Sequence, residues 1–262
     1  MQIMGILNAT PDSFFTPSRA LDVEQAVAFA LKQQHEGADI LDIGGESTRP
    51  GAEFVSLDEE LSRVLPILKE LQGKISIPLS IDTRRSEVAV KAIEFGVEII
   101  NDISGFQDEA MRKVAASAGC RVVVMHMQGI PKDMQKEPSY PRGVVVEVCD
   151  FFKRQIDLLI REGVDPKNII LDPGIGFGKS LEDNLKLIRA AKQLRSLGFP
   201  LLYGVSRKTF IRKIAECSVD EALFPTLAVD SFLMLEGVDF IRVHDVKPHV
   251  QARILLQQIQ KV

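Results

Sequence analysis

The sequence has no apolar run that approaches the ~20 residues of a membrane-spanning helix, so no transmembrane segment is expected. Its N-terminus lacks a basic stretch followed by an apolar segment and a cleavage site, which predicts a cytoplasmic location. Cysteine is scarce: Cys120, Cys149 and Cys217 are odd in number and have no C-x-x-C spacing. This pattern indicates buried thiols and argues against both a disulfide framework and a zinc ribbon.

The sequence also lacks an excess of positive charge. Its 32 Lys and Arg residues against 36 Asp and Glu leave a formal net charge of −4, so nucleic acid is not an expected partner. No low-complexity segment and no linker rich in Pro, Gly or Ser interrupts the 262 residues. With 45% hydrophobic and 26% charged residues, the composition is typical of a soluble globular enzyme, and one domain over residues 1–262 is predicted.

Short runs rich in β-branched residues alternate with longer amphipathic stretches along the whole chain. Eight strands are predicted, at residues 3–8, 39–44, 77–82, 97–102, 121–126, 168–173, 200–205 and 239–244. Helical patterns lie between them, for example at residues 57–72, 144–163 and 221–237. Most strand runs are continuously apolar, as parallel strands covered on both faces are. The count and the length predict an α/β fold, a single TIM-type (β/α)8 barrel, because an open doubly wound sheet needs only five or six strands.

One glycine-rich stretch, LDPGIGFGKS at residues 171–180, has the composition of a phosphate-binding loop but not the spacing. The NTPase phosphate loop needs a glycine five residues before Gly178, where Pro173 stands. The dinucleotide fingerprint G-x-G-x-x-G needs a glycine at position 179, which is Lys179. Neither nucleotide-binding motif is present, and the aspartate directly before the glycines, Asp172, indicates another use for the loop.

In such a barrel, the carboxyl ends of the strands and the loops after them form the active-site face. Polar residues lie at these positions in every predicted strand or just after it: Asn8, Asp42, Asp82, Asn101, Asp102, His126, Asp172, Ser206, Arg207, Lys208, Arg242 and His244. Any one of them has an alternative structural explanation as a helix cap. A complete ring of them favours a binding site.

The ring divides into two kinds of chemistry. Asp82, Asn101 and Asp172 offer acceptors and an amide, which suit a flat heterocycle with several N–H donors, particularly a guanidine-like edge. The other members, together with the loop after the second strand, offer donors and positive charge for phosphate, with room for a hard cation such as Mg²⁺: Asn8, Ser47, Thr48, Arg49, Arg242 and His244.

Eight motifs, in order and each at a strand end, resemble those of the dihydropteroate synthase family. They are MGILNATPDSF (4–14), DIGGESTRPGA (42–52), SIDTRRSEV (80–88), IINDISGF (99–106), VVMHMQGIPKDMQ (123–135), LDPGIGFGKSLEDN (171–184), GVSRKTFI (204–211) and RVHDV (242–246). The resemblance runs from residue 3 to about residue 250. It implies a TIM barrel in the folate pathway that condenses 6-hydroxymethyl-7,8-dihydropterin diphosphate with p-aminobenzoate to give 7,8-dihydropteroate and diphosphate, a transferase that sulfonamides block.

The resemblance also implies a role for each matching residue. The pterin is expected against Asp82, Asn101, Asp172 and Lys208, with Met125, Phe177 and Gly204 at its faces. The diphosphate is expected at Asn8, Thr48, Arg49, Arg242 and His244, with Asn8 also reaching Mg²⁺. The p-aminobenzoate is expected at Ser47, Thr48, Pro50, Phe177, Lys208 and Thr209. Catalysis is assigned to Asn8, Lys208, Arg242 and His244, and the family implies a homodimer.

On this reading the glycines after Asp172 keep the loop thin so that the pterin ring can approach, and Lys179 and Ser180 do not contact phosphate. The mechanism implied is ionisation at the pterin methylene followed by attack of the amine, with no covalent enzyme intermediate. A structural role is favoured for His126.

The sequence departs from the family pattern in places. Thr16 replaces a carboxylate that family members place in the first loop, which makes closure of that loop uncertain. Arg84-Arg85 adds positive charge near the mouth and is interpreted as a solvated turn, and Pro225 replaces a common glycine at a helix start.

Two other functions are compatible with a pterin slot. A methyltetrahydrofolate-dependent corrinoid methyltransferase shares the barrel but has no diphosphate to bind, so the residues at 47–50, 206–208 and 242–245 favour the synthase. A barrel that binds pterin without catalysis is supported only by the altered first loop.

Overall fold

The protein, a computed structural model, is described over residues 1–9, 19–48 and 51–261, with side chains omitted for residues 19–22. Eight parallel strands form one sheet: β1 (Gln2–Asn8), β2 (Ile40–Gly44), β3 (Leu79–Asp82), β4 (Ile99–Asp102), β5 (Arg121–Met125), β6 (Ile169–Asp172), β7 (Leu202–Tyr203) and β8 (Phe240–Val243). Their order is β6-β5-β4-β3-β2-β1-β8-β7. A parallel bridge between Leu171 and Leu201 joins the two ends, so the sheet closes and the predicted TIM-type barrel is confirmed.

All eight predicted strands are present, and most are one or two residues shorter than expected. The largest difference is β7, expected over residues 200–205 but formed only by Leu202–Tyr203. Pro200 accepts a hydrogen bond at its carbonyl from Leu171 N (2.9 Å) but has no N–H to donate, so regular pairing does not extend back to it. Closure of the barrel at this seam therefore depends on few backbone bonds.

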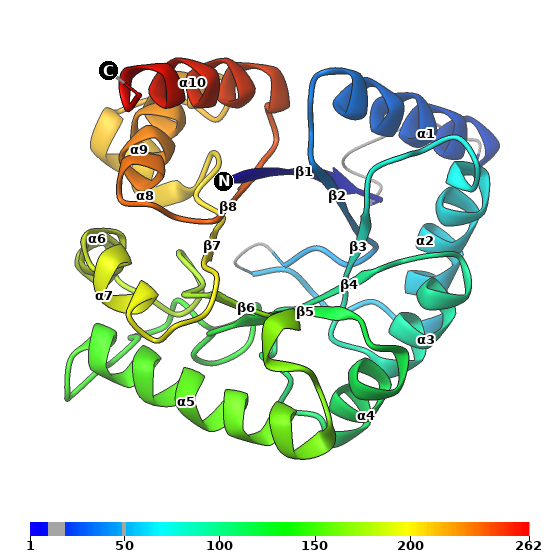
Figure 1. The fold of residues 1–262 in the computed structure, drawn as a ribbon, viewed down its shortest axis with the longest axis horizontal. Helices are drawn as coiled ribbons and strands as arrows, with labels where there is room; N and C mark the ends of the chain where they lie inside the picture. The colour runs from blue at the N-terminus through cyan, green and yellow to red at the C-terminus, as the bar shows by residue number, and fades with distance from the viewer. Residues whose placement is uncertain (10–18, 49–50, 262) are drawn as a thin grey trace.

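Helices surround the strands on all sides (Figure 1). They are α1 (Arg19–His35), α2 (Leu57–Leu71), α3 (Ser86–Glu94), α4 (Glu109–Ala118), α5 (Val144–Glu162), α6 (Leu181–Arg189), α7 (Ala191–Arg195), α8 (Thr209–Ala215), α9 (Leu223–Leu235) and α10 (Val246–Ile259), with a 3₁₀ turn at Pro166–Asn168. Local chemistry sets several ends. Ser56 caps α2 by accepting from Glu59 N, and Gly119 ends α4 in the left-handed conformation.

The core has two layers because successive strand residues point to opposite faces. One set packs inside the barrel: Met4, Ile40, Ile99, Val123, Ile170, Leu202 and Phe240. The residues of opposite parity, such as Leu41, Ile100 and Ile241, pack outward against the helices in a much larger cluster. The inside of the barrel is thus filled at one level, and the residues further along each strand face its mouth. Among the described residues, no helix has the length and apolar character of a membrane-spanning segment.

Candidate active site

The alternation of the strands places the predicted site residues inside the mouth of the barrel. Residues two positions apart in a strand point to the same side, so the residue two positions after an inward-facing apolar residue also faces the inside of the barrel. The residues found in this way are Asp42, Asn101, Met125, Asp172, Gly204 and Arg242. Asp82 has the same parity as Ser80, which is the register partner of Asp42. Asp102 has the opposite parity, and its carboxylate accepts hydrogen bonds from Ser104 N (2.8 Å) and Phe106 N (2.8 Å) in the turn after β4. Parity therefore separates ligand-facing residues from turn-forming ones.

Arg242 lies at the centre of the inward-facing group. Its Nε donates to Asp42 Oδ2 (2.6 Å), and its Nη2 donates to Asp82 Oδ2 (2.8 Å). Asn101 Nδ2 donates to the same Asp42 oxygen (3.0 Å). Two residues expected at the pterin, Asp82 and Asn101, and one expected at the diphosphate, Arg242, are thus members of one network. Asp42 is predicted at a strand end without a ligand role, and its inward parity, two residues after Ile40, is the signal that identifies it as part of the site.

Burial controls the charge of this network. Asp82 is 9% exposed, and burial raises its pKa to about 7, against the opposing effect of Arg242. For Arg242 burial acts to lower the pKa, but the carboxylates of Asp42 and Asp82 outweigh it, so the pKa is higher than usual. Asp42 Oδ1 is buried and has no hydrogen-bond partner among the described residues. The mouth of the barrel therefore carries a permanent positive charge and carboxylate oxygens that can accept further hydrogen bonds.

On the opposite side, Asp172 ends β6, where Gly174 N donates to its Oδ1 (2.8 Å). Burial raises the pKa of Asp172, and the ammonium of Lys208 partly offsets this. Lys208 Nζ donates to Ile175 O and lies 4.4 Å from the centre of the Phe177 ring. Burial lowers the pKa of Lys208 to about 8. Three of the predicted residues, Asp172, Phe177 and Lys208, are thereby brought together.

The glycines after Asp172 meet a requirement of the protein backbone that the sequence does not show. A Cβ at Gly174 would lie closer than 3.0 Å to His126 O, and one at Gly178 equally close to Gln128 O. Both have positive φ, +65° and +61°, a region that glycine enters without strain. These two glycines are required by the backbone after β5, and the expectation that they also make room for a ligand stays a prediction. A Cβ at Gly176 would instead lie 3.2 Å from Lys208 Cδ.

Lys179 and Ser180 bond within the chain, consistent with the expectation that neither contacts phosphate. The Lys179 ammonium is 2% exposed and lies 3.0 Å from His126 Nδ1, 3.2 Å from His126 O and 2.9 Å from Phe177 O. Burial lowers the pKa of Lys179 to about 7 and that of His126 to about 3, so His126 accepts at Nδ1. Ser180 caps α6 in a reciprocal arrangement with Asp183. His126 thus has the structural role that the sequence favours.

The remaining donors lie at the rim. His244 Nδ1 and Ser206 Oγ are 2.9 Å apart, while Arg207 makes two parallel bonds to Asp245, at 2.7 and 2.9 Å. This paired arrangement commits Arg207 to joining the loops after β7 and β8. Gly204 faces Arg242, because a Cβ there would lie 3.6 Å from Arg242 Cβ.

The other predicted residues are less enclosed or not described. Asn8, Ser47 and Thr48 are half-buried, and Thr209 begins α8. Arg49 and Pro50 lie outside the described residues, as does Thr16, so neither their contacts nor the altered first loop is placed here.

The described residues contain no group of three His, Cys, Asp or Glu side chains arranged to hold a metal ion. Mg²⁺ commonly binds proteins through one or two oxygen ligands, with phosphate oxygens and water completing its shell. A single amide oxygen at the rim, that of Asn8, fits an ion that arrives with a diphosphate. Chemically, the site combines buried acceptors for N–H groups, a central guanidinium and donors at the rim.

A comparison with protein families matches residues 4–244 to the family described as "Pterin binding enzyme". Among curated proteins, the chain is 45% identical over 252 residues to the dihydropteroate synthase of Synechocystis sp., a match that covers 95% of this chain and 86% of the relative.

Solved structures give the same result. The chain is similar to the dihydropteroate synthase of Xanthomonas albilineans with 4-aminobenzoic acid, with a TM-score of 0.94 and 39% identity over 100% of this chain and 93% of the other. It is equally similar in fold to the Yersinia pestis dihydropteroate synthase in complex with a sulfonamide drug, with a TM-score of 0.94 and 37% identity, covering 100% and 94% of the two chains.

Proposed function

We propose how the residues of this chain divide the work of a dihydropteroate synthase. The chain belongs to the family of pterin binding enzymes and has the function of a dihydropteroate synthase. The reaction joins 6-hydroxymethyl-7,8-dihydropterin diphosphate to p-aminobenzoate and releases diphosphate. The observation that carries the assignment is the inward-facing network of Arg242, Asp42, Asp82 and Asn101, with the Asp172 carboxylate close enough to raise the pKa of Arg242. A methyltransferase would have no use for the donors at the rim, and the 45% identity to a synthase also favours the synthase.

The pterin binds in the mouth against Asp82, Asn101, Asp172 and Lys208. Its guanidine-like edge carries several N–H donors, and a carboxylate can accept two of them in parallel. Asp172 supplies that carboxylate, because within the described part of the chain only one of its oxygens accepts a hydrogen bond, from Gly174 N. Phe177 and Met125 provide apolar surface for the ring, and Gly204 leaves room beside Arg242.

The diphosphate is held by Arg242 and His244 with Asn8, Thr48 and Arg49. Release breaks the bond between the pterin methylene carbon and the diphosphate oxygen, and the leaving group takes the electron pair. Positive groups at the developing charge stabilise this step, since they are already oriented when the bond breaks. Asn8 is the ligand for Mg²⁺, which when bound neutralises part of the charge of the leaving group.

The p-aminobenzoate lies against Ser47, Thr48, Pro50, Phe177 and the Lys208-Thr209 turn. Its amine nitrogen forms a bond to the methylene carbon and then loses one proton. Phe177 and Lys208 contribute to both substrate sites, which brings the two reacting ends together. No side chain forms a covalent bond in this scheme. The sulfonamide bound to the Yersinia pestis relative supports inhibition of this chain by the same class of drug.

The chain acts as a homodimer through the outer surface of α9 and α10. Large apolar side chains are exposed there: Phe224, Phe232, Leu235, Ile254, Leu255 and Ile259. Phe224, Phe232 and Leu235 fall within about 80° of one another around α9, because spacings of eight and eleven residues correspond to rotations of about 80° and about 20°. An exposed apolar surface of this kind is typical of a protein interface.

The first test replaces Asp172 with Asn, which keeps the shape of the side chain and removes its charge. The guanidine-like edge then loses a charge-assisted pair, which contributes about 1.5–3 kcal/mol, so pterin affinity should fall at least tenfold. Isothermal titration with the hydroxymethylpterin, and a turnover assay with both substrates, measure the two losses.

Asp157→Asn is the matched control, because Asp157 is an exposed residue of α5. It should leave affinity and turnover unchanged. Unchanged pterin affinity in a folded Asp172→Asn protein would show that β6 does not bind the pterin. A wild-type protein that binds pterin but forms no dihydropteroate would show that the barrel is not a synthase.

A further inference from the structure

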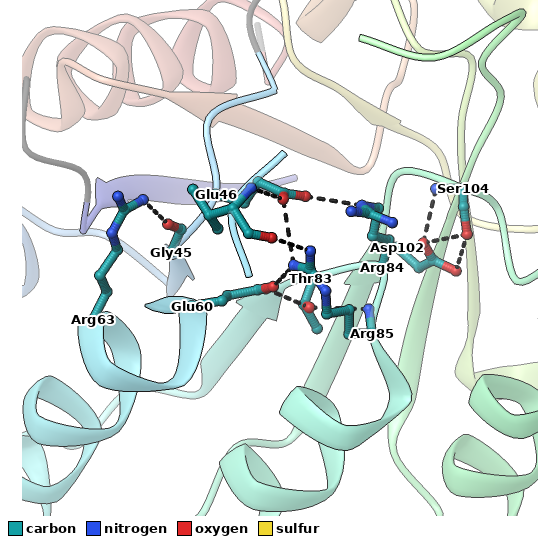
Figure 2. A network of polar contacts seen from close by, with 10 residues as sticks. Gly45, Glu46, Glu60, Arg63, Thr83, Arg84, Arg85, Asp102 and Ser104 are labelled. Carbon is teal, nitrogen blue, oxygen red and sulfur yellow. Dashed lines mark hydrogen bonds and ion pairs between the residues drawn. The ribbon is translucent and has the colours of Figure 1, made fainter. Parts of the chain in front are cut away.

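Four charged side chains meet beside the mouth of the barrel, from the loop after β2, from α2 and from the turn after β3 (Figure 2). They are Glu46, Glu60, Arg84 and Arg85, called here the loop anchor. The side chains of Arg84 and Arg85 are only 28% and 16% exposed. Their interpretation as a solvated turn is therefore wrong: the two arginines are ion-paired with buried carboxylates.

The loop anchor balances two acidic and two basic groups. Arg84 Nε donates to Glu46 Oε2 (2.9 Å), and Arg85 Nη1 donates to Glu46 Oε1 (3.3 Å) and to Glu60 Oε2. Thr83 Oγ1 donates to the second oxygen of Glu60 (2.6 Å) and accepts from Arg85 N (3.1 Å). Burying charges is costly unless each has a partner, and here each carboxylate has one.

The anchor holds both ends of the segment from Glu46 to Val55. Val55 N donates to Glu46 Oε1 (3.0 Å), and Arg85 Nη2 donates to Val55 O. The Arg84 guanidinium also lies 3.8 Å from the centre of the Phe54 ring. One carboxylate and one guanidinium thus join the beginning of the segment to its end.

The residue before the segment is also held, by α2. Gly45 O accepts from Arg63 Nη1 (2.7 Å), as Figure 2 shows. A Cβ at Gly45 would lie 2.8 Å from Val64 Cγ1, so only glycine lets the chain pass this close to the helix. The preceding residue, Gly44, is the register partner of both Asn8 and Asp82. The segment therefore starts from a fixed point between two predicted site residues.

Ser47 and Thr48 directly follow Glu46. We infer that Glu46 is a positioning residue: the loop anchor holds Glu46 and Val55 in place, and Glu46 thereby positions the adjacent Ser47 and Thr48 for p-aminobenzoate. This inference rests on the proposed function. It adds a residue and a cluster to which no ligand role has been given, and it assigns them an effect on the second substrate rather than on the pterin.

The test compares the same substitution at two glutamates of this segment. Glu46→Gln removes the charge from the buried anchor, in which the Glu46 side chain is 5% exposed. Glu53→Gln is the control, because Glu53 pairs with Lys132 at the same 2.9 Å but its side chain is 73% exposed. Exposed pairs contribute little, whereas breaking a buried pair leaves an uncompensated charge.

Three quantities are measured for each protein: amide hydrogen exchange of the peptide containing Val55, KM for p-aminobenzoate and KM for the pterin diphosphate. For Glu46→Gln we expect exchange at Val55 to accelerate and KM for p-aminobenzoate to rise, each by about tenfold, with KM for the pterin diphosphate within about twofold of wild type. Glu53→Gln should behave as wild type.

Equal increases in both KM values would indicate a general structural role and overturn the inference, as would unchanged exchange and KM. If Glu46→Gln does not fold, Arg84→Met, which removes one contact of Glu46 at the rim, should give smaller changes with the same selectivity. A wild-type protein without turnover would refute the proposed function instead, and the exchange measurement would still decide whether Glu46 holds Val55.

Discussion

At the scale of single residues, the site is organised by Arg242. It contacts Asp42 and Asp82 and so connects the strands β2, β3 and β8 at the mouth. The division of the strand-end residues into pterin acceptors and phosphate donors is incomplete for this reason, since Arg242, expected at the diphosphate, is bonded to Asp82, expected at the pterin. Removing it would leave two buried carboxylates without their cation, an arrangement that is strongly destabilising. Loss of activity in Arg242→Ala would therefore not be specific evidence for a contact with diphosphate.

The protonation states of Lys208 and Asp82 predict a narrow pH profile. Asp82, with a pKa of about 7, is ionised above that pH and loses its charge as the pH falls through it. Lys208, with a pKa of about 8, is charged below that pH and loses its charge as the pH rises through it. If both charges are needed, kcat/KM for the pterin diphosphate should rise through pH 7 and fall through pH 8, because this ratio reports the free enzyme.

Lys208→Arg tests the basic limb, because a guanidinium stays charged over the whole accessible range. The variant should keep the fall in kcat/KM below pH 7 and lose the fall above pH 8. Ionisation of the substrates is common to both proteins, so the difference between their profiles isolates residue 208. An identical basic limb in the two proteins would assign that limb to another group.

At the scale of elements, the loops after β5 and β6 are packed against each other through glycine. Gly174 passes within contact distance of His126 O, and Lys179 bonds to the same carbonyl at 3.2 Å. His126 N in turn donates to Asp172 O (2.9 Å). The end of β6 and the loop that carries Phe177 are thereby fixed by protein contacts before any ligand binds.

Gly174→Ala and Gly119→Ala separate the two reasons for a glycine. Both residues have φ of +65°, but a Cβ at Gly119, at the end of α4, would meet nothing within 4 Å. The left-handed conformation alone costs an alanine about 1–2 kcal/mol. Gly174→Ala should lose a further ~1–3 kcal/mol from overpacking against His126 O. Urea unfolding of the two variants measures the difference, and equal losses would mean that the β5 loop can move aside.

At the scale of the whole molecule, the exposed apolar residues are not evenly distributed. α9 carries Phe224 at 77% exposure, and α10 carries Leu255 and Ile259 at 64% and 68%. In Figure 1 these two helices lie together on the outer wall, away from the strand ends. An interface there would leave the mouth of the barrel open to substrates.

Sedimentation velocity tests the proposed homodimer. The wild-type chain, of 29.1 kDa, should sediment at twice its mass at micromolar concentration. Phe224→Asp should sediment as a monomer, because in a twofold interface each substitution acts twice and buries an unpaired charge. Val146→Asp, at an exposed position of α5, should remain dimeric. A monomeric wild type would refute the dimer, and dissociation by Val146→Asp alone would place the interface on another face.

The sequence by itself determined the eight strands, the barrel and the residues that end each strand. These features have local signals: a buried parallel strand is apolar over its whole length, and polar residues stand out where it ends. Parity within β4 also places Asn101 and Asp102 on opposite faces, but the packing of Ile99 inside the barrel identifies the inward face. The family motifs extend this to the activity, since they occur in order along nearly the whole chain.

Only the tertiary structure decided which of these residues touch. Arg242 and Asp42 are 200 positions apart, and Arg85 and Val55 meet only because the loops after β2 and β3 are neighbours on a closed barrel. A pair of arginines in a turn has the same sequence pattern whether water or two buried carboxylates surround it. Likewise, a glycine gives no indication of whether a ligand or His126 O lies beside it. Such contacts depend on distances through space, which are set when the barrel closes and not by any local pattern of residues.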